Sequence, residues 1–158
     1  MSNPPVILLA EDQADDILLT RKALDDGKVV HRLQIVRNGE EAIDYLHGFG
    51  NYANRVEYPL PDLMLLDLKM PCLDGFDVLH WARDQPALKA LRIVVLTSSD
   101  DLDDVTLAYR FGADSFLVKP LTSACCVQIR NALQCDSLWG KTPDECWSGI
   151  MPKGVNRE

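Results

Sequence analysis

Four short apolar segments recur along the chain, and each one ends at a polar side chain. They are residues 6–10 before Glu11 and Asp12, residues 63–66 before Asp67, residues 93–96 before Thr97, and residues 115–118 before Lys119. Runs of this kind are typical of strands that are buried on both faces of a parallel sheet. Parallel strands end at one edge of the sheet, where open α/β folds bind their ligands, so we expect these polar side chains to converge.

Helical patterns fill the intervals between these segments, and residues 33–36 add a fifth short strand. The expected helices span residues 17–24, 40–46, 75–83, 101–111 and 122–135, with Asp15 or Asp16 capping the first and the Asn38-Gly39 turn opening the second. This alternation predicts an α/β fold, a flavodoxin-like doubly wound sheet of five parallel strands in the order 2-1-3-4-5 with five helices. Residues 48–61 form a long loop, which is either a contact surface or a plain surface insertion.

Composition narrows the class of protein. A chain of 158 residues that is 47% hydrophobic suits one well-cored domain and is too short for two ordinary ones. Its formal net charge of −8 disfavours a nucleic-acid partner, because binding phosphates requires clustered Lys and Arg. There is neither an apolar run of the roughly 20 residues that a membrane span needs nor a signal segment, so we expect a soluble, cytoplasmic protein with no membrane partner.

The five cysteines are odd in number, and their spacing matches no zinc-binding pattern. We therefore expect reduced thiols. Cys125 and Cys126 stand in a helical pattern, where at least one of them should pack as a small apolar residue.

The polar residues at the predicted sheet edge suit phosphoryl chemistry. Mg²⁺ prefers oxygen ligands, and Glu11, Asp12 and Asp67 would supply three carboxylates whose mutual repulsion the cation relieves. An aspartate can attack phosphorus as a nucleophile, and Asp67 is best placed because its strand should be central. Lys119 would offer an ammonium group, and Thr97 a hydroxyl donor, to the phosphoryl oxygens.

As a set, these residues resemble the receiver domain of bacterial two-component response regulators. The resemblance covers residues 6–133 and rests on four segments in the family's order and spacing, namely residues 7–12, 62–71 with Asp74-Gly75 after them, 94–97 and 112–120. It implies that residues 1–139 form a receiver domain and that residues 140–158 form a C-terminal tail.

The resemblance also implies a role for each site residue. Asp67 is the implied phosphoacceptor; Asp12 and Asp67 are direct Mg²⁺ ligands, joined by the backbone carbonyl of Lys69 and, through water, by Glu11. Thr97 and Lys119 would sense the phosphoryl group, and Phe116 matches the aromatic residue that swings inward when the hydroxyl moves. Phosphorylation would then shift the population towards an active form with a re-packed surface, made by helix 101–111, strand 115–118 and the last helix.

Within the family, the chain is similar to single-domain regulators that act with phytochrome-type histidine kinases. The shared features are Glu11-Asp12 with residues 14–16, residues 37–42, the loop at residues 50–53, and Leu138-Trp139, whereas Gln13-Ala14 departs from the usual Asn-Pro. This similarity implies a sensor histidine kinase, such as a bacteriophytochrome, as the upstream partner. It also implies a downstream protein partner and a homodimer through the fourth and fifth helices.

Other interpretations of the same residues remain open at this point. Glu11-Asp12 and Thr97-Ser98-Ser99 could simply cap helices. A haloacid-dehalogenase-type phosphatase also uses an aspartate nucleophile and Mg²⁺, but it needs a second aspartate where this chain has Lys69, so an enzyme is not expected. A receiver-like adaptor that is never phosphorylated is the third possibility.

Overall fold

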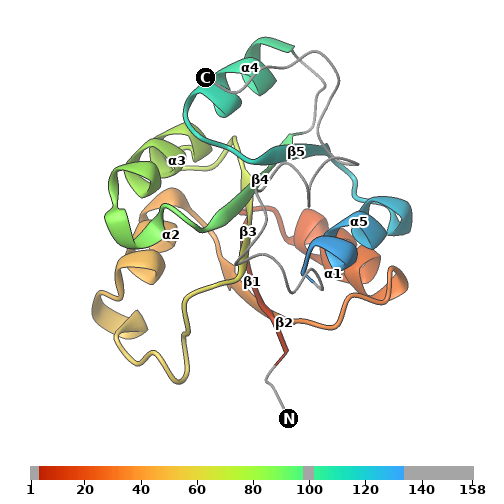
Figure 1. Cartoon of the computed structure of the whole chain (residues 1–158), viewed down its shortest axis with the longest axis horizontal. Helices are drawn as coiled ribbons and strands as arrows, with labels where there is room; N and C mark the ends of the chain where they lie inside the picture. Colours follow the sequence, from red (N-terminus) through yellow and green to blue (C-terminus); the bar gives the residue numbers. More distant parts are fainter. Residues whose placement is uncertain (1–3, 98–101, 134–158) are drawn as a thin grey trace.

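The computed structural model describes residues 4–97 and 102–133, and it arranges them as one parallel sheet between two layers of helices (Figure 1). The strands are β1 Val6–Ala10, β2 Arg32–Val36, β3 Leu63–Asp67, β4 Arg92–Thr97 and β5 Ser115–Val118. They pair in the order β2-β1-β3-β4-β5, with Ile7 opposite Leu63 and Leu63 opposite Arg92. The predicted fold class and strand order are therefore confirmed, and β3 is the central strand.

The helices are α1 Ala14–Asp26, α2 Gly39–His47, α3 Gly75–Asp84, α4 Leu102–Arg110 and α5 Ser123–Leu133, with short 3-10 turns η1 Gly50–Tyr52 and η2 Pro86–Leu88. Helices α1 and α5 lie together on one face of the sheet, and α2 and α3 lie together on the other (Figure 1). Helices α1 to α4 each return the chain to the start of the next parallel strand, as crossover connections between parallel strands require.

The sheet divides the core into two clusters because successive side chains of a strand point to opposite faces. Leu8, Met64 and Leu66 pack towards Tyr45, Val78 and Leu79 of α2 and α3. Ile7, Leu9 and Leu65 pack on the other side, towards Ile17, Leu24, Cys126 and Ile129 of α1 and α5. Burial on both faces explains why β1 and β3 are almost entirely apolar up to the acidic residues that follow or end them.

The helix boundaries follow local capping chemistry with one correction. Asn38 caps α2, and its side-chain oxygen accepts a hydrogen bond from the backbone N–H of Glu41 at 2.8 Å. The prediction that Asp15 or Asp16 caps α1 is wrong, because the N-cap is Gln13, which makes no side-chain cap hydrogen bond, and both aspartates lie inside the first turn. The backbone of Gln13 is extended, and the N-cap lies two residues before Asp15 and three before Asp16. The predicted helix start at Asp101, the Ser98-Ser99 cap and the tail at residues 140–158 lie outside the described residues.

The long loop before β3 is tied down by α2. Arg55 donates to the carbonyl oxygens of Tyr45 at 2.7 Å and Leu46 at 2.9 Å, which satisfies acceptors that the end of a helix leaves open. The rings of Tyr52 and Tyr58 pack against the ring of Tyr45, with centroids 5.1 and 6.0 Å away. The loop is thus an ordered extension of the α2 core.

Three of the five cysteines lie in the part of the chain that the structure describes. Cys126 is fully buried between α1 and α5, which confirms that one cysteine of the pair packs as an apolar residue, and Cys72, Cys125 and Cys126 are free thiols. Cys135 and Cys146 lie outside the described residues.

In the part of the chain that the structure describes, no helix combines the length and the apolar character needed to cross a bilayer.

Candidate functional site: an acidic cluster at the carboxyl edge of the sheet

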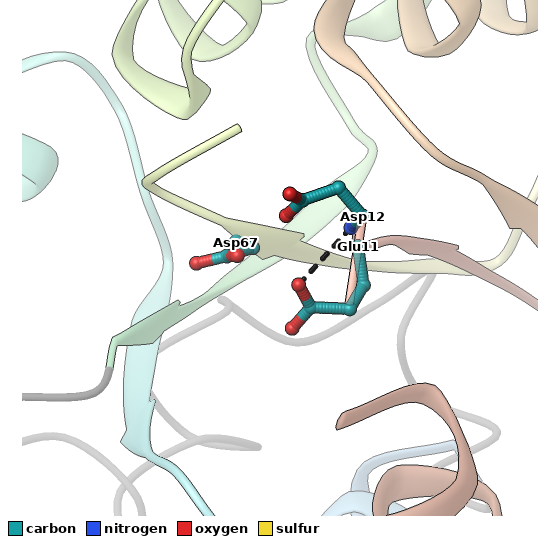
Figure 2. Close-up of side chains that lie close together, drawn as sticks. All are labelled: Glu11, Asp12 and Asp67. Atoms are coloured by element: carbon teal, nitrogen blue, oxygen red, sulfur yellow. Dashed lines mark hydrogen bonds between the residues drawn. The ribbon is translucent and has the colours of Figure 1, made fainter. Parts of the chain in front are cut away.

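The acidic residues that follow β1 and end β3 meet at one edge of the sheet. Figure 2 shows Glu11, Asp12 and Asp67 around the adjacent ends of these two strands, and one carboxylate oxygen from each lies within 4.8 Å of the others. Glu11 is fully buried and Asp67 is only 3% exposed. The pairing of β1 with β3 brings together residues that are 55 or 56 positions apart in the sequence.

This cluster has the donor set of a divalent-cation site. Oδ1 of Asp12 is buried and has no hydrogen-bond partner among the described residues, although Oδ2 accepts from the side-chain amide of Gln13 at 3.1 Å. A buried carboxylate oxygen without a partner costs free energy, and crowded carboxylates repel one another. Mg²⁺ binds oxygen ligands of this kind and relieves both costs, so the residues fit the ion that the sequence predicts.

Lys119 enters the cluster from the end of β5. Its ammonium nitrogen Nζ lies 2.8 Å from Oε1 of Glu11, 3.0 Å from Oδ2 of Asp16 and 3.4 Å from Oδ2 of Asp67. The backbone of Lys119 is held to β4, because its N–H donates to the carbonyl of Thr97 at 2.7 Å. The peptide bond from Lys119 to Pro120 is cis. One cation therefore faces three carboxylates from three different segments of the chain.

Burial and charge shift the protonation of this cluster. Burial raises the pKa of Glu11 to about 7, helped by its hydrogen bond with Asp67, although Lys119 pulls it down. Burial lowers the pKa of Lys119, but hydrogen bonds to Glu11 and Asp16 outweigh it, so the net pKa lies above the usual value for lysine. Lys119 is therefore a permanent cation at neutral pH.

The turn from β3 to α3 holds Asp67 in place. Oδ1 of Asp67 accepts from the backbone N–H of Lys69 at 3.2 Å, and the N–H of Gly75 donates to the carbonyl of Leu68 at 2.9 Å. A Cβ atom at Gly75 would lie 2.5 Å from the carbonyl oxygen of Asp67, so only glycine lets α3 start this close to the strand. The side chain of Lys69 is exposed.

Thr97 and Phe116 lie on the two strands beyond Asp67. Thr97 ends β4, is 3% exposed and pairs with Val118 of β5, which places it at the same sheet edge as Asp67. Phe116 is half-buried on β5 and meets the ring of Tyr109 edge-on, with centroids 6.4 Å apart. The structure therefore gathers Glu11, Asp12, Asp67 and Lys119 in contact and sets Phe116 further back against the α2 and α3 side of the core.

Asp16 is a member of the site that its sequence context does not indicate. The residue has the pattern of a helix cap, whereas its carboxylate contacts Lys119. Helical periodicity does not link Asp16 to Asp12, because Asp12 precedes the N-cap of α1, so the sequence carries no local signal for this contact. Asp16 lies in the first turn of α1, the helix that follows the carboxyl end of β1.

Comparisons with known proteins agree with this geometry. Residues 7–130 match the family model of the response regulator receiver domain. Response regulator Rcp1 of Synechocystis sp. is 41% identical over 119 residues, which cover 75% of this chain and 79% of Rcp1. The crystal structure of the Mn²⁺-bound form of Rcp1 covers 88% of this chain and 96% of its own, with a TM-score of 0.69 and 35% identity.

Two further solved structures are similar along most of the chain. Response regulator RPA3017, in red light signaling of R. palustris, has a TM-score of 0.72 and 34% identity, and the match covers 80% of this chain and 89% of that one. The phosphorylated cyanobacterial phytochrome response regulator RcpA has a TM-score of 0.71 and 34% identity, with 89% and 97% covered. The predicted resemblance to receiver domains, and to those of phytochrome regulators in particular, is confirmed.

Proposed function

Since the chain belongs to the response regulator receiver domain family, we propose that it accepts a phosphoryl group on Asp67 from a sensor histidine kinase. The observation that carries this proposal is the convergence of Glu11, Asp12 and Asp67 with the ammonium group of Lys119 at the carboxyl edge of the central strand. An anionic nucleophile, a site for a divalent cation and a fixed positive charge are the parts that phosphoryl transfer to a carboxylate needs.

In the proposed reaction, a carboxylate oxygen of Asp67 attacks phosphorus. A P–O bond forms, the P–N bond of a phosphohistidine breaks, and the histidine nitrogen keeps the bonding electron pair. Asp12 and Asp67 would hold Mg²⁺ directly, with the backbone carbonyl of Lys69, and Glu11 would hold it through water. When bound, Mg²⁺ neutralises charge on the phosphoryl oxygens and on the crowded carboxylates. Lys119 and the hydroxyl group of Thr97 would stabilise the remaining charge.

The phosphoryl group would bias a two-state surface. It adds roughly two negative charges near neutral pH, and these attract Lys119 and Thr97. We propose that Phe116 then moves into the space that Thr97 leaves, so that α4, β5 and α5 re-pack. The re-packed surface would then serve in a homodimer or in binding a downstream protein.

Light signalling is the context that the relatives favour. The similar structures include a regulator in red light signaling and a phytochrome response regulator. We therefore propose a phytochrome-type histidine kinase as the phosphoryl donor, which would place the protein in the cytoplasm. Incubation with a phosphorylated bacteriophytochrome kinase should transfer the label faster than incubation with a kinase that has no phytochrome module. Equal rates would contradict this assignment of the donor.

The experiment for the phosphoacceptor is intact-mass analysis after incubation with acetyl phosphate. We expect one phosphoryl adduct with Mg²⁺, none with EDTA, and none in Asp67→Asn. Asp84→Asn is the matched control, because Asp84 is an exposed aspartate on α3. No adduct on a folded protein that binds Mg²⁺ would contradict the proposal and favour the adaptor that is never phosphorylated. Steady release of phosphate from p-nitrophenyl phosphate would instead favour the phosphatase.

A further inference from the structure

Lys119 divides its contacts between the acidic cluster and a carboxylate outside it. Glu11 and Asp67 belong to the cluster that could hold a cation, whereas Asp16 lies on the first turn of α1 and does not. Nζ of Lys119 is 3.0 Å from Oδ2 of Asp16 and 3.4 Å from Oδ2 of Asp67. The ammonium group therefore lies closer to the α1 carboxylate than to the residue that would carry the phosphoryl group.

We propose that Asp16 is a positioning residue, which holds Lys119 on the α1 side of the site and thereby weakens the affinity of the site for a phosphoryl group. This inference rests on the proposed function, since it assigns Asp16 a part in the same phosphoryl site. The contact between Asp16 and Lys119 stabilises the unphosphorylated state. In the phosphorylated state, Lys119 would have to weaken or release this contact in order to bind the phosphoryl group.

Competition for the protons of one ammonium group is the physical basis. Lysine has three donors, and in this structure they face Glu11, Asp16 and Asp67. A cation bound to the cluster would engage Asp67 directly and Glu11 through water, whereas Asp16 lies outside the cluster and would keep its contact with Lys119. A phosphoryl group on Asp67 then competes with Asp16 for that ammonium group. The side chain of Lys119 is only 10% exposed, so water replaces few of its contacts.

The size of the effect follows from the exposure of Asp16. Its side chain is 30% exposed, which places the ion pair between a surface pair and a buried one. Pairs of this kind change an equilibrium by about two- to fivefold. Loss of the Asp16 charge should therefore strengthen the binding of a phosphoryl mimic by about that factor.

The test measures the affinity of beryllofluoride, a mimic of the phosphoryl group, by calorimetric titration of the full chain with Mg²⁺ present. Asp16→Asn removes the charge and keeps the shape of the side chain. Asp15→Asn is the matched control, because Asp15 lies in the same turn, is exposed, and is not among the described ion-pair partners of Lys119. We expect Asp16→Asn to bind beryllofluoride about two- to fivefold more tightly than Asp15→Asn.

A second measurement separates positioning from a general effect of charge. In a Lys119→Gln background, the difference between Asp16→Asn and Asp15→Asn should disappear, since the ammonium group that Asp16 holds is absent. Asp16→Glu should restore the affinity of the natural protein, because a glutamate can reach the same ammonium group. If Asp16 had a purely structural role, Asp16→Asn would instead change the thermal stability, and its affinity for beryllofluoride would equal that of Asp15→Asn.

The possible results separate a failure of the positioning role of Asp16 from a failure of the proposed phosphoryl-accepting function. If the natural protein binds beryllofluoride with Mg²⁺ but Asp16→Asn and Asp15→Asn bind it equally, the proposed function stands and the positioning role is wrong. Weaker binding by Asp16→Asn than by Asp15→Asn would also overturn it, because Asp16 would then prepare Lys119 for the phosphoryl group. If the natural protein binds no beryllofluoride while it binds Mg²⁺, the proposed phosphoryl site itself falls, and this inference falls with it.

Discussion

Arg83 of α3 donates a hydrogen bond from Nη2 to Oδ2 of Asp114, just before β5, across 2.9 Å. The same carboxylate oxygen accepts from the backbone N–H of Ile93 at 2.8 Å, and Nε of Arg83 donates to the carbonyl of Gly112 at 2.9 Å. Asp114 is 4% exposed. One ion pair therefore joins α3 to β4 and to the segment between α4 and β5.

Removal of this carboxylate should destabilise the fold. Asp114→Ala removes the acceptor of Nη2 of Arg83 and of the N–H of Ile93, so we expect a loss of about 3 kcal/mol in the free energy of unfolding. Urea-induced unfolding checks it. The control is Asp26→Ala, which breaks the exposed pair of Lys22 and Asp26 at 3.9 Å and should change stability by no more than about 0.5 kcal/mol. Equal effects of the two substitutions would refute this account of the buried pair.

The acidic cluster predicts opposite effects of one substitution with and without Mg²⁺. In EDTA, Asp12→Asn should raise the melting temperature, because it removes one of three crowded negative charges and a buried oxygen that lacks a partner. With Mg²⁺ at about 100 times its Kd, the natural protein should gain about 2.7 kcal/mol, and the variant should gain much less. Thermal melts in the two buffers measure both effects. A variant that Mg²⁺ stabilises as much as it does the natural protein would exclude Asp12 as a ligand.

Gly75 should be intolerant of a side chain for a reason that concerns the site. In Gly75→Ala the new methyl group would meet the carbonyl oxygen of Asp67 at 2.5 Å and Cα of Leu68 at 2.7 Å, so the start of α3 must move. We expect a loss of about 1–3 kcal/mol in the free energy of unfolding, together with weaker Mg²⁺ binding. Chemical unfolding and Mg²⁺ titration follow the two effects. Unchanged Mg²⁺ affinity in the variant would show that this junction does not position Asp67.

Tyr45 predicts how stability changes at alkaline pH. Burial raises its pKa to about 12, against a lowering effect of Arg55, and its hydroxyl group donates to the carbonyl of Pro59 at 2.8 Å. An unfolded tyrosine loses its proton from about pH 10, whereas the folded protein keeps it until about pH 12. The folded state therefore binds more protons in this window, and stability falls as the pH rises through it.

Tyr45→Phe removes this titration. We expect the variant to be less stable than the natural protein by about 1 kcal/mol near pH 9, where the hydrogen bond is lost. Its stability should then fall less steeply between about pH 10 and pH 12. Urea midpoints across this range test the prediction. Parallel pH dependences of the two proteins would show that the buried phenol does not titrate in this window.

The sequence predicted the architecture because every layer of it is encoded locally. The apolar run at residues 63–66 is stable in a strand only if both faces of the strand are buried. Five alternations of strand and helix, joined by right-handed crossovers, are compatible with few topologies. The edge at which Asp12, Asp67 and Lys119 would meet follows from the direction of parallel strands. The long loop was harder to predict, since its order depends on Arg55 reaching the carbonyls that end α2, a contact that no local pattern indicates.

By itself, then, the sequence determined the sheet, its strand order, the family and the identity of the acidic residues at the carboxyl edge. Only the tertiary structure decided which partner each charge takes. Asp16 has the sequence pattern of a helix cap, yet its carboxylate lies 3.0 Å from Lys119, more than 100 residues later in the chain. Periodicity and capping act over one turn of a helix or one strand. Contacts between side chains at strand ends depend on register and helix rotation, which the packing of the whole core sets.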